Sequence, residues 1–175
     1  KGRREFNVAR ITILSPNLPE AFHGLRIVQI SDTHLGSFGD DSTIVQNGVD
    51  LINAERPDLI LFTGDLVNDY ADEAERFIPA LAELKARLGK FSILGNHDYF
   101  TDPVPLWNNL KASGWHCLEN ANALVERGSA CLAIMGIQDP QATNGRFRGI
   151  RFGPGPSWIS ASRDIPEHAW KLCLS

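Results

Sequence analysis

The stretch IVQISDTHLGSF, residues 27–38, begins as a strand and ends in polar residues. Apolar residues alternate as far as Ile30, and Asp32, His34 and Gly36 follow where that pattern stops. Side chains two positions apart in an extended chain point the same way, so Asp32 and His34 can reach one common point. The spacing therefore predicts a pair of ligands at the end of a strand.

The same change from apolar to polar residues occurs twice more. The run DLILFTGD, residues 58–65, ends in Gly-Asp, and FSIL, residues 91–94, continues into Gly-Asn-His-Asp at 95–98. Residues at helical spacing separate these runs, in STIVQNGVDLINAERP (42–57) and ADEAERFIPALAELKARLG (71–89). Strands that alternate with helices predict an α/β fold with a parallel sheet and right-handed crossovers.

The remaining elements are predicted from shorter patterns. Alternation indicates a strand at 6–14 and a second, more buried one at 25–31. Further along we expect a helix break at Pro79, a helix at 102–113, strands at 115–118, 123–127, 130–137 and 171–175, and a long polar loop at 138–160. A loop of that length in a compact domain is usually functional or disordered.

Composition excludes several classes of protein. With 175 residues, 43% of them hydrophobic, the chain is long enough for one domain with its own core. A balance of 17 Lys and Arg against 21 Asp and Glu, a net charge of -4, argues against nucleic acid as a partner. The wide spacing of Cys117, Cys131 and Cys173 argues against disulfides and a structural zinc site, so we expect reduced, mostly buried thiols.

Membrane attachment stays open at the level of sequence. No run of about 18 apolar residues is present, so we expect no membrane span within these residues. Lys1, Arg3 and Arg4 form a basic cluster of the kind that flanks a membrane segment on its cytoplasmic side, and a solvated terminus would look the same. A membrane tether upstream of Lys1 and an untethered domain are both compatible with this cluster.

Ligands of open parallel sheets bind at the edge where the carboxyl ends of the strands meet. We therefore expect Asp32, His34, Asp65, Asn96 and His97 to converge at that edge. Taken singly, each feature has a structural interpretation: either aspartate could cap a helix, and the GNHD stretch could be a turn held by its asparagine. Taken together, they form a hard oxygen and nitrogen set that suits Mn²⁺, Fe²⁺ or Zn²⁺.

The blocks SDTHLG, TGDLVN and LGNHDYF resemble the first three signature blocks of the calcineurin-like metallophosphoesterases. The resemblance extends from about residue 25 to Ser175, and GIQDP at 136–140 is similar to the small bacterial branch, whose members often carry membrane helices before the catalytic domain. It implies an α/β fold in which a two-sheet β-sandwich is flanked by helices (αββα) and is incomplete at its C-terminus. Residues 1–24 would form an N-terminal strand and lead-in to the phosphoesterase domain at 25–175.

The same resemblance implies a centre of two divalent metal ions that share a bridging hydroxide. Asp32 and His34 would hold the first ion, Asp65 would bridge both, and Asn96 would hold the second. His97 would act with Asp65 in catalysis, by donating a proton or hydrogen bond to the leaving-group oxygen. Such a centre hydrolyses phosphodiester, pyrophosphate or phosphomonoester bonds, and the motifs do not separate these substrates. A supporting role is expected for Asn68.

The sequence also departs from the family pattern. A histidine after a later strand and a Gly-His-x-His block are missing, and we expect His116 and His168 to be structural or surface residues. Because KLCLS resembles the strand before that missing histidine, we expect the chain to be a fragment that hydrolyses phosphodiesters more slowly than an extended version. If the protein ended at Ser175, a non-catalytic partner-binding domain or an inactive fragment would be the better interpretation.

Substrate binding is predicted from the loop NGRFRGIRF, which places Arg146, Arg148 and Arg151 among aromatic and aliphatic residues. Guanidinium groups bind phosphate well, so these arginines are candidates for holding a phosphorylated small-molecule or lipid substrate. The alternative is a solvated loop whose aromatic residues pack back on the core. The family resemblance implies a soluble catalytic domain, in the bacterial cytoplasm or on the cytoplasmic side of the inner membrane.

Overall fold

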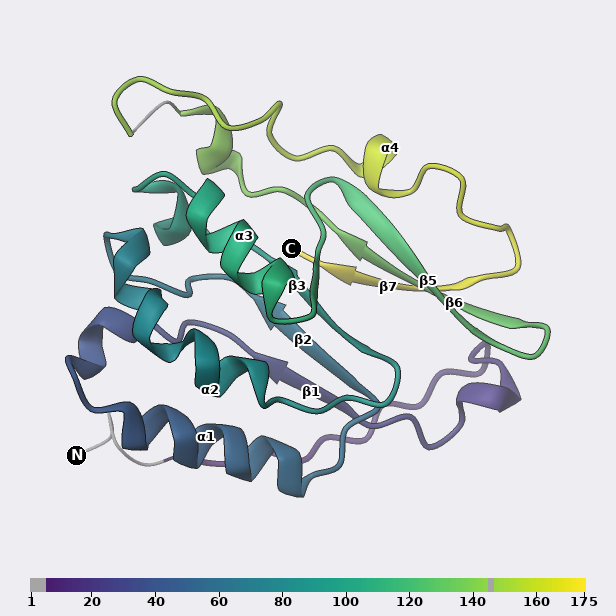
Figure 1. Ribbon diagram of the computed structural model, residues 1–175. Helices are drawn as coiled ribbons and strands as arrows, with labels where there is room; N and C mark the ends of the chain where they lie inside the picture. Colours follow the sequence, from purple (N-terminus) through teal and green to yellow (C-terminus); the bar gives the residue numbers. More distant parts are fainter. Residues whose placement is uncertain (1–5, 145–146) are drawn as a thin grey trace.

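Two β-sheets packed face to face form the centre of the protein, as seen in a computed structural model that describes residues 6–144 and 147–175 (Figure 1). The first sheet is parallel throughout, in the order β1 (Ile27–Ile30), β2 (Leu59–Thr63), β3 (Gly89–Ile93) and β4 (Trp115–Cys117). The second sheet contains the antiparallel pair β5 (Ala121–Arg127) and β6 (Ala130–Gly136), with β7 (Trp170–Leu174) parallel to β6. The predicted two-sheet α/β fold is confirmed.

Helices cover the outer face of the first sheet. They are α1 (Ser42–Ala54), α2 (Ile78–Ala82) and α3 (Val104–Ala112), which lie along one side of the strands in Figure 1. On the outer face of the second sheet the described residues place only the one-turn helix α4 (Trp158–Ala161) and a small cluster around Cys131, Ala133 and Ala169. The fourth layer of the expected αββα arrangement is therefore slight in this part of the chain.

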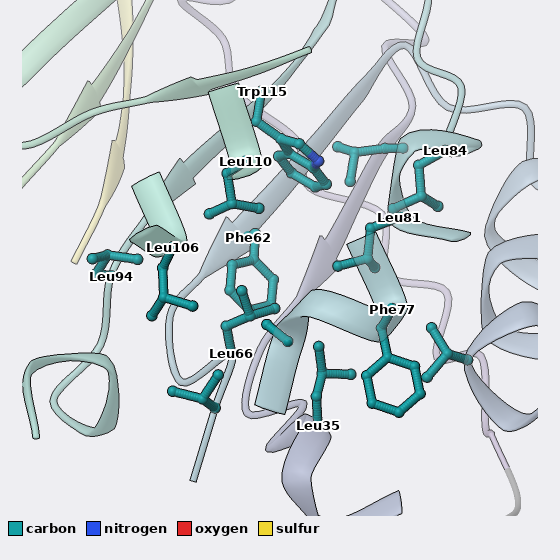
Figure 2. Packing of buried hydrophobic residues seen from close by; sticks show 14 of the residues in the cluster. Leu35, Phe62, Leu66, Phe77, Leu81, Leu84, Leu94, Leu106, Leu110 and Trp115 are labelled. Carbon is teal, nitrogen blue, oxygen red and sulfur yellow. The ribbon is translucent and has the colours of Figure 1, made fainter. Parts of the chain in front are cut away.

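Strand β2 joins two hydrophobic cores because its side chains alternate between the faces of the first sheet. Ile60 and Phe62 face the helices, where they belong to the cluster shown in Figure 2 with residues of α2 and α3. Leu59 and Leu61 face the second sheet and pack in a cluster that includes Ile134. A central parallel strand that is buried on both faces explains the continuous apolar run.

One strand prediction is wrong, and another is wrong in part. Strand β1 is the edge strand of its sheet, and Ile27 and Gln29 are exposed, so it is less buried than expected. Residues 6–14 form no strand, and the side chains of Ile11, Ile13 and Leu14 are more than 80% exposed. Alternation sets only the direction of side chains, whereas a strand also needs a neighbouring backbone for hydrogen bonds. None of the described strands pairs with this segment.

The helix predicted at 71–89 is shorter and divided. A 3₁₀ helix spans Ala71–Phe77, and α2 starts at Ile78, with Pro79 in its first turn as the restart signal indicated. Beyond α2 the side chain of Asn53 donates to the carbonyl of Glu83 and accepts from the amide of Lys85. These tertiary hydrogen bonds compete with a continued helix.

The remaining predictions are confirmed with changed boundaries. The loop at 138–160 contains a 3₁₀ helix at Pro140–Thr143 as well as α4. All three cysteines are free, as expected. Cys131 is buried and Cys117 is half-buried, but Cys173 is exposed, so the expectation of mostly buried thiols is wrong for Cys173. None of the helices in the two described ranges has both the length and the apolar character needed to cross a membrane.

Candidate metal centre

The loops that follow β1 and β2 lie side by side at the carboxyl edge of the first sheet. The amide of Asp32 donates to the carbonyl of Gly64 over 3.0 Å, and the amide of His34 donates to the carbonyl of Asp65 over 3.1 Å. The parallel pairing of the strands is thus continued by their loops. As a result the polar residues of the first block are held against those of the second.

Three of these residues have left-handed backbone conformations. The φ angles are 53° at Asp32, 42° at His34 and 58° at Asp65. A non-glycine residue in this region costs on the order of 1 kcal/mol or more, so the surrounding hydrogen bonds must hold it there. Strain of this kind concentrates at functional sites, and here all three residues carry side chains that can bind a metal.

A buried carboxylate joins the second and third loops. Asp98 is fully buried, and its two oxygens accept the amides of Asp65, Leu66, Val67 and Gly95 at 2.9–3.1 Å. Burial raises the pKa of this carboxyl group to about 7, although the amides of Gly95 and Val67 oppose the shift. Asp98 lies next to the predicted site residues, but sequence reasoning assigned it no role. Its position as the last residue of the GNHD stretch was the available signal.

The side chains of His34, Asp65 and His97 come together at this edge. One possible ligand atom from each lies within 4.8 Å of the others, with Nε2 of His34 3.9 Å from Oδ2 of Asp65. The two imidazole rings meet edge to face, with centroids 4.7 Å apart. All three side chains are half-buried, so solvent or a substrate can reach them.

Hydrogen bonds orient both imidazole rings. Nδ1 of His34 lies 3.2 Å from the carbonyl of Val67, and Nδ1 of His97 lies 2.7 Å from the carbonyl of Asn68. A carbonyl oxygen only accepts, so each Nδ1 must carry the proton. In the neutral rings Nε2 then has a free lone pair, which is the arrangement that metal-binding histidines use.

Asp32 and Asn96 lie beside this trio and line a pocket of about 320 Å³ together with Asp65. Asp32 is exposed and its carboxylate accepts a hydrogen bond from the hydroxyl of Ser31. Asn96 is half-buried. Asp65 is therefore shared between the two groups of side chains, with the two histidines on one side and Asp32 and Asn96 facing the pocket.

Glycine is required where the loops meet. A Cβ atom added to Gly95 would overlap Oδ1 of Asp65, and one added to Gly64 would overlap the amide nitrogen of Gly95. The oxygen of Asp65 that faces Gly95 also accepts the amide of His97 over 3.0 Å. These glycines allow the second and third loops to approach until Asp65 and His97 share a site.

Other residues named from the sequence have structural partners. The side-chain amide of Asn68 donates to Ser37, and its backbone amide donates to Glu73, a residue that sequence reasoning missed. The ring of His116 stacks on Phe91 with centroids 5.1 Å apart. His168 is exposed.

The described loop arginines lie outside the lining of the pocket at the carboxyl edge. Arg148 and Arg151 are exposed and are absent from the lining of the 320 Å³ pocket, and Arg146 lies outside the described residues. The guanidinium of Arg148 lies 5.2 Å from the centre of the Phe147 ring. Phe152 packs near Tyr99 in the helix-side core, as the alternative of a loop packed back on the core predicted.

Comparison with known proteins identifies the family. Residues 25–153 match the family model of the calcineurin-like phosphoesterases, so the chain belongs to that family. A transmembrane protein with metallophosphoesterase domain from Danio rerio is 35% identical over 81% of this chain and 33% of its own length.

Two bacterial relatives match shorter segments. The UDP-2,3-diacylglucosamine pyrophosphatase LpxG of Chlamydia trachomatis is 45% identical over 55% of this chain and 30% of its own length. The uncharacterized metallophosphoesterase YkuE of Bacillus subtilis is 37% identical over 59% of this chain and 36% of its own length. The chain thus spans about a third of the length of these relatives.

Proposed function

We propose that this chain carries much of the binuclear metal centre of a phosphoesterase. The observation that supports the proposal most strongly is the convergence of His34, Asp65 and His97 from three separate strand ends. Membership of the calcineurin-like phosphoesterase family supports the same conclusion. The proposed reaction is hydrolysis of a phosphodiester, pyrophosphate or phosphomonoester bond.

The donor set fits divalent cations. His34 offers a free Nε2 lone pair and Asp65 offers carboxylate oxygens, while Asp32 and Asn96 add oxygen donors from the adjoining pocket. Following what the family resemblance implies, we assign Asp32 and His34 to one ion and Asn96 to a second. Asp65 would serve both, because it lies between the histidines and the pocket that Asp32 and Asn96 line. When bound, such ions polarise phosphoryl oxygens and lower the pKa of water.

His97 is proposed to serve the leaving group. Its Nδ1 is fixed on the carbonyl of Asn68, which directs Nε2 toward the site. In the doubly protonated ring Nε2 carries a proton that can be given to the leaving-group oxygen. Asp65 accepts the backbone amide of His97 and so holds this ring in place.

The proposed substrate is a phosphorylated small molecule or lipid. The relative from Chlamydia trachomatis, whose name describes a pyrophosphatase of UDP-2,3-diacylglucosamine, supports this class. Arg148 and Arg151 are proposed to contact the substrate, since both are exposed. The name of the transmembrane relative from Danio rerio supports a tether upstream of Lys1. The basic cluster of Lys1, Arg3 and Arg4 favours the cytoplasmic side of the membrane for the domain.

Metal binding tests the proposed centre. Titration of the chain with Mn²⁺ by calorimetry is expected to show an affinity that falls about tenfold or more in Asp65→Asn and His34→Ala, because each removes a ligand. His168→Ala is the control, since that histidine is exposed. Equal affinity in all four proteins would contradict the assignment. A loss of affinity in His97→Ala as well would make His97 a ligand rather than a proton donor.

A further inference from the structure

A second and larger pocket lies at the opposite end of the first sheet. Its volume is about 860 Å³, and its lining includes residues at or just before the amino ends of all four strands. Arg26 precedes β1, Pro57 precedes β2, Gly89 begins β3 and Gly114 precedes β4. The carboxyl-edge pocket that holds Asp65 shares none of these residues.

The lining of this pocket is strongly basic. It contains five cationic residues, which are Arg26, Arg56, Lys85, Arg87 and Lys90, and no acidic residue among the described lining residues. The whole chain has a net charge of -4, so an overall basic surface does not account for this concentration. Cations gathered in a concave site attract anions more strongly than the same cations spread over a surface.

Only part of this charge is neutralised by the protein. Arg87 lies 2.7 Å from Oδ1 of the buried Asp58, which also lies 3.2 Å from Arg127. The ammonium of Lys90 donates to the carbonyl of Ser113 over 2.8 Å, and burial lowers its pKa. One buried carboxylate is thus shared by two guanidinium groups.

Arg26 donates to the carbonyl of Glu55 over 3.3 Å, and the remaining two cations are free to bind a ligand. Arg56 and Lys85 are exposed, and neither side chain has a hydrogen bond or ion pair with any residue that the structure describes. A guanidinium and an ammonium with all their donors available suit the oxygens of a phosphate group. Because no described protein group neutralises them, both charges are available to an anionic ligand.

One asparagine fixes the two loops that carry these cations. Asn53 accepts the amide of Lys85 over 2.8 Å and donates to the carbonyl of Glu83 over 3.0 Å. Its own carbonyl accepts the amide of Arg56, where the backbone has a left-handed φ of 52°. The end of α1 and the loop before β3 are therefore tied together, and the pocket is formed before any ligand arrives.

The size and the walls of the pocket indicate a ligand larger than a bare ion. Pro57, Leu84 and Ala86 supply apolar wall next to the charges. Small-molecule sites occupy roughly 300–1,000 Å³ and combine apolar walls with a few polar groups. A phosphate attached to an organic group fits both features.

We propose that this pocket binds the phosphate group of a phosphorylated ligand at a site separate from the metal centre. Arg56 and Lys85 make the main contacts, and Arg87 supports them while it remains paired with Asp58. The phosphate belongs either to a soluble organic phosphate or to the head group of an acidic phospholipid. Binding at this end requires no metal, so it does not depend on the function proposed for the carboxyl edge.

Two probes distinguish the sources of phosphate. The chain is treated with a chelator, so that the metal centre does not contribute, and is titrated with pyrophosphate by calorimetry. Sedimentation with phosphatidylglycerol vesicles, against phosphatidylcholine vesicles, measures lipid binding at low and high salt. Saturable pyrophosphate binding supports a soluble ligand, whereas salt-sensitive binding to phosphatidylglycerol alone supports a lipid head group.

Matched variants locate the binding. The double variant Arg56→Gln, Lys85→Gln is expected to weaken it about tenfold or more, and Arg56→Lys, Lys85→Arg to retain it. The control Arg163→Gln, Lys171→Gln removes the same charge from exposed residues that do not line the pocket, and is expected to bind like the unmodified chain. Absence of binding to both probes, or equal weakening in the test and control variants, would overturn the proposal.

A measurement on the unmodified chain avoids any effect of the substitutions on folding. Lysine acetylation is followed by mass spectrometry with and without the probe that binds. The bound probe is expected to slow acetylation of Lys85 several-fold. Lys171, which lies in β7, is expected to react at the same rate with and without ligand. Unchanged reactivity of Lys85 at a saturating ligand concentration would also overturn the proposal.

Discussion

The two ends of the parallel sheet carry opposite chemistry. At the carboxyl end, Asp32, Asp65 and the buried Asp98 are combined with two histidines, whereas the amino end is lined by arginines and lysines. The carboxyl end is held by backbone amides that converge on Asp98, while the amino end is held by Asn53. The comparison shows that one sheet can gather carboxylates and imidazoles at one end and cationic side chains at the other.

Loss of Asp98 is expected to destabilise the loops at the carboxyl end of the sheet more than the other substitutions below. Asp98→Ala leaves four backbone amides without their acceptor, and each unpaired buried group costs about 1–3 kcal/mol. Allowing for relaxation, we expect the free energy of unfolding to fall by about 3–5 kcal/mol. Urea denaturation measures the change.

The exposed Asp72→Ala is the control for this substitution and is expected to stay within about 0.5 kcal/mol of the unmodified chain. A similar denaturation midpoint for Asp98→Ala and Asp72→Ala would show that Asp98 does not organise the carboxyl end.

The approach of the second and third loops is tested by Gly95→Ala. The added Cβ overlaps Oδ1 of Asp65, and such overpacking costs about 1–3 kcal/mol. We expect a loss of stability of that size, with Mn²⁺ affinity lowered about tenfold because Asp65 is displaced.

The matched substitution for this test is Gly39→Ala, which meets no atom within 4 Å but has a left-handed φ of 57°. Strain should lower its stability by about 1 kcal/mol and leave Mn²⁺ affinity unchanged. If both variants bound Mn²⁺ like the unmodified chain, the close approach of Gly95 to Asp65 would have no part in the site.

A smaller effect is expected in the pH dependence of stability at the carboxyl end. Glu119, which accepts the amide of Leu94 near the carboxyl end, has its pKa raised by burial. The folded protein therefore holds this proton to a higher pH than the unfolded chain, so the contribution of Glu119 is full below its ordinary pKa and is lost as pH rises through the raised value. We expect Glu119→Gln to make the decline in stability with rising pH shallower.

Thermal unfolding at a series of pH values, from about 4 upward, measures this effect. The control is Glu167→Gln, because Glu167 is exposed. Parallel curves for the unmodified chain and Glu119→Gln would show that burial of this carboxyl group does not influence folding.

Much of the carboxyl end could be predicted from sequence because its signals are local. Asp32 and His34 are two residues apart, and the GD and GNHD stretches each follow an apolar run directly. A strand followed by polar residues identifies its own carboxyl end, so placement at one edge needs only the strand order. The role of Asp98 could not be predicted, since the amides that it accepts come from two different loops.

The amino end could not be predicted in the same way. Arg26, Arg56, Lys85 and Lys90 are spread over 65 residues of a chain with a negative net charge. They meet only because three strands start at one edge of the sheet and Asn53 joins two of the loops. Nothing in the spacing of these residues along the chain indicates that they lie close together in the folded protein.

The sequence by itself determined the α/β order, the residues at the strand ends and the family, because each depends on short-range periodicity or on contiguous blocks. Tertiary structure decided that residues 6–14 form no strand, that β1 lies at the edge, and that Asp65 is shared between two groups of side chains. The physical reason is that strand pairing, burial and charge clustering depend on neighbours that are distant in sequence. Local patterns set the direction of side chains, and only the folded chain determines what those side chains meet.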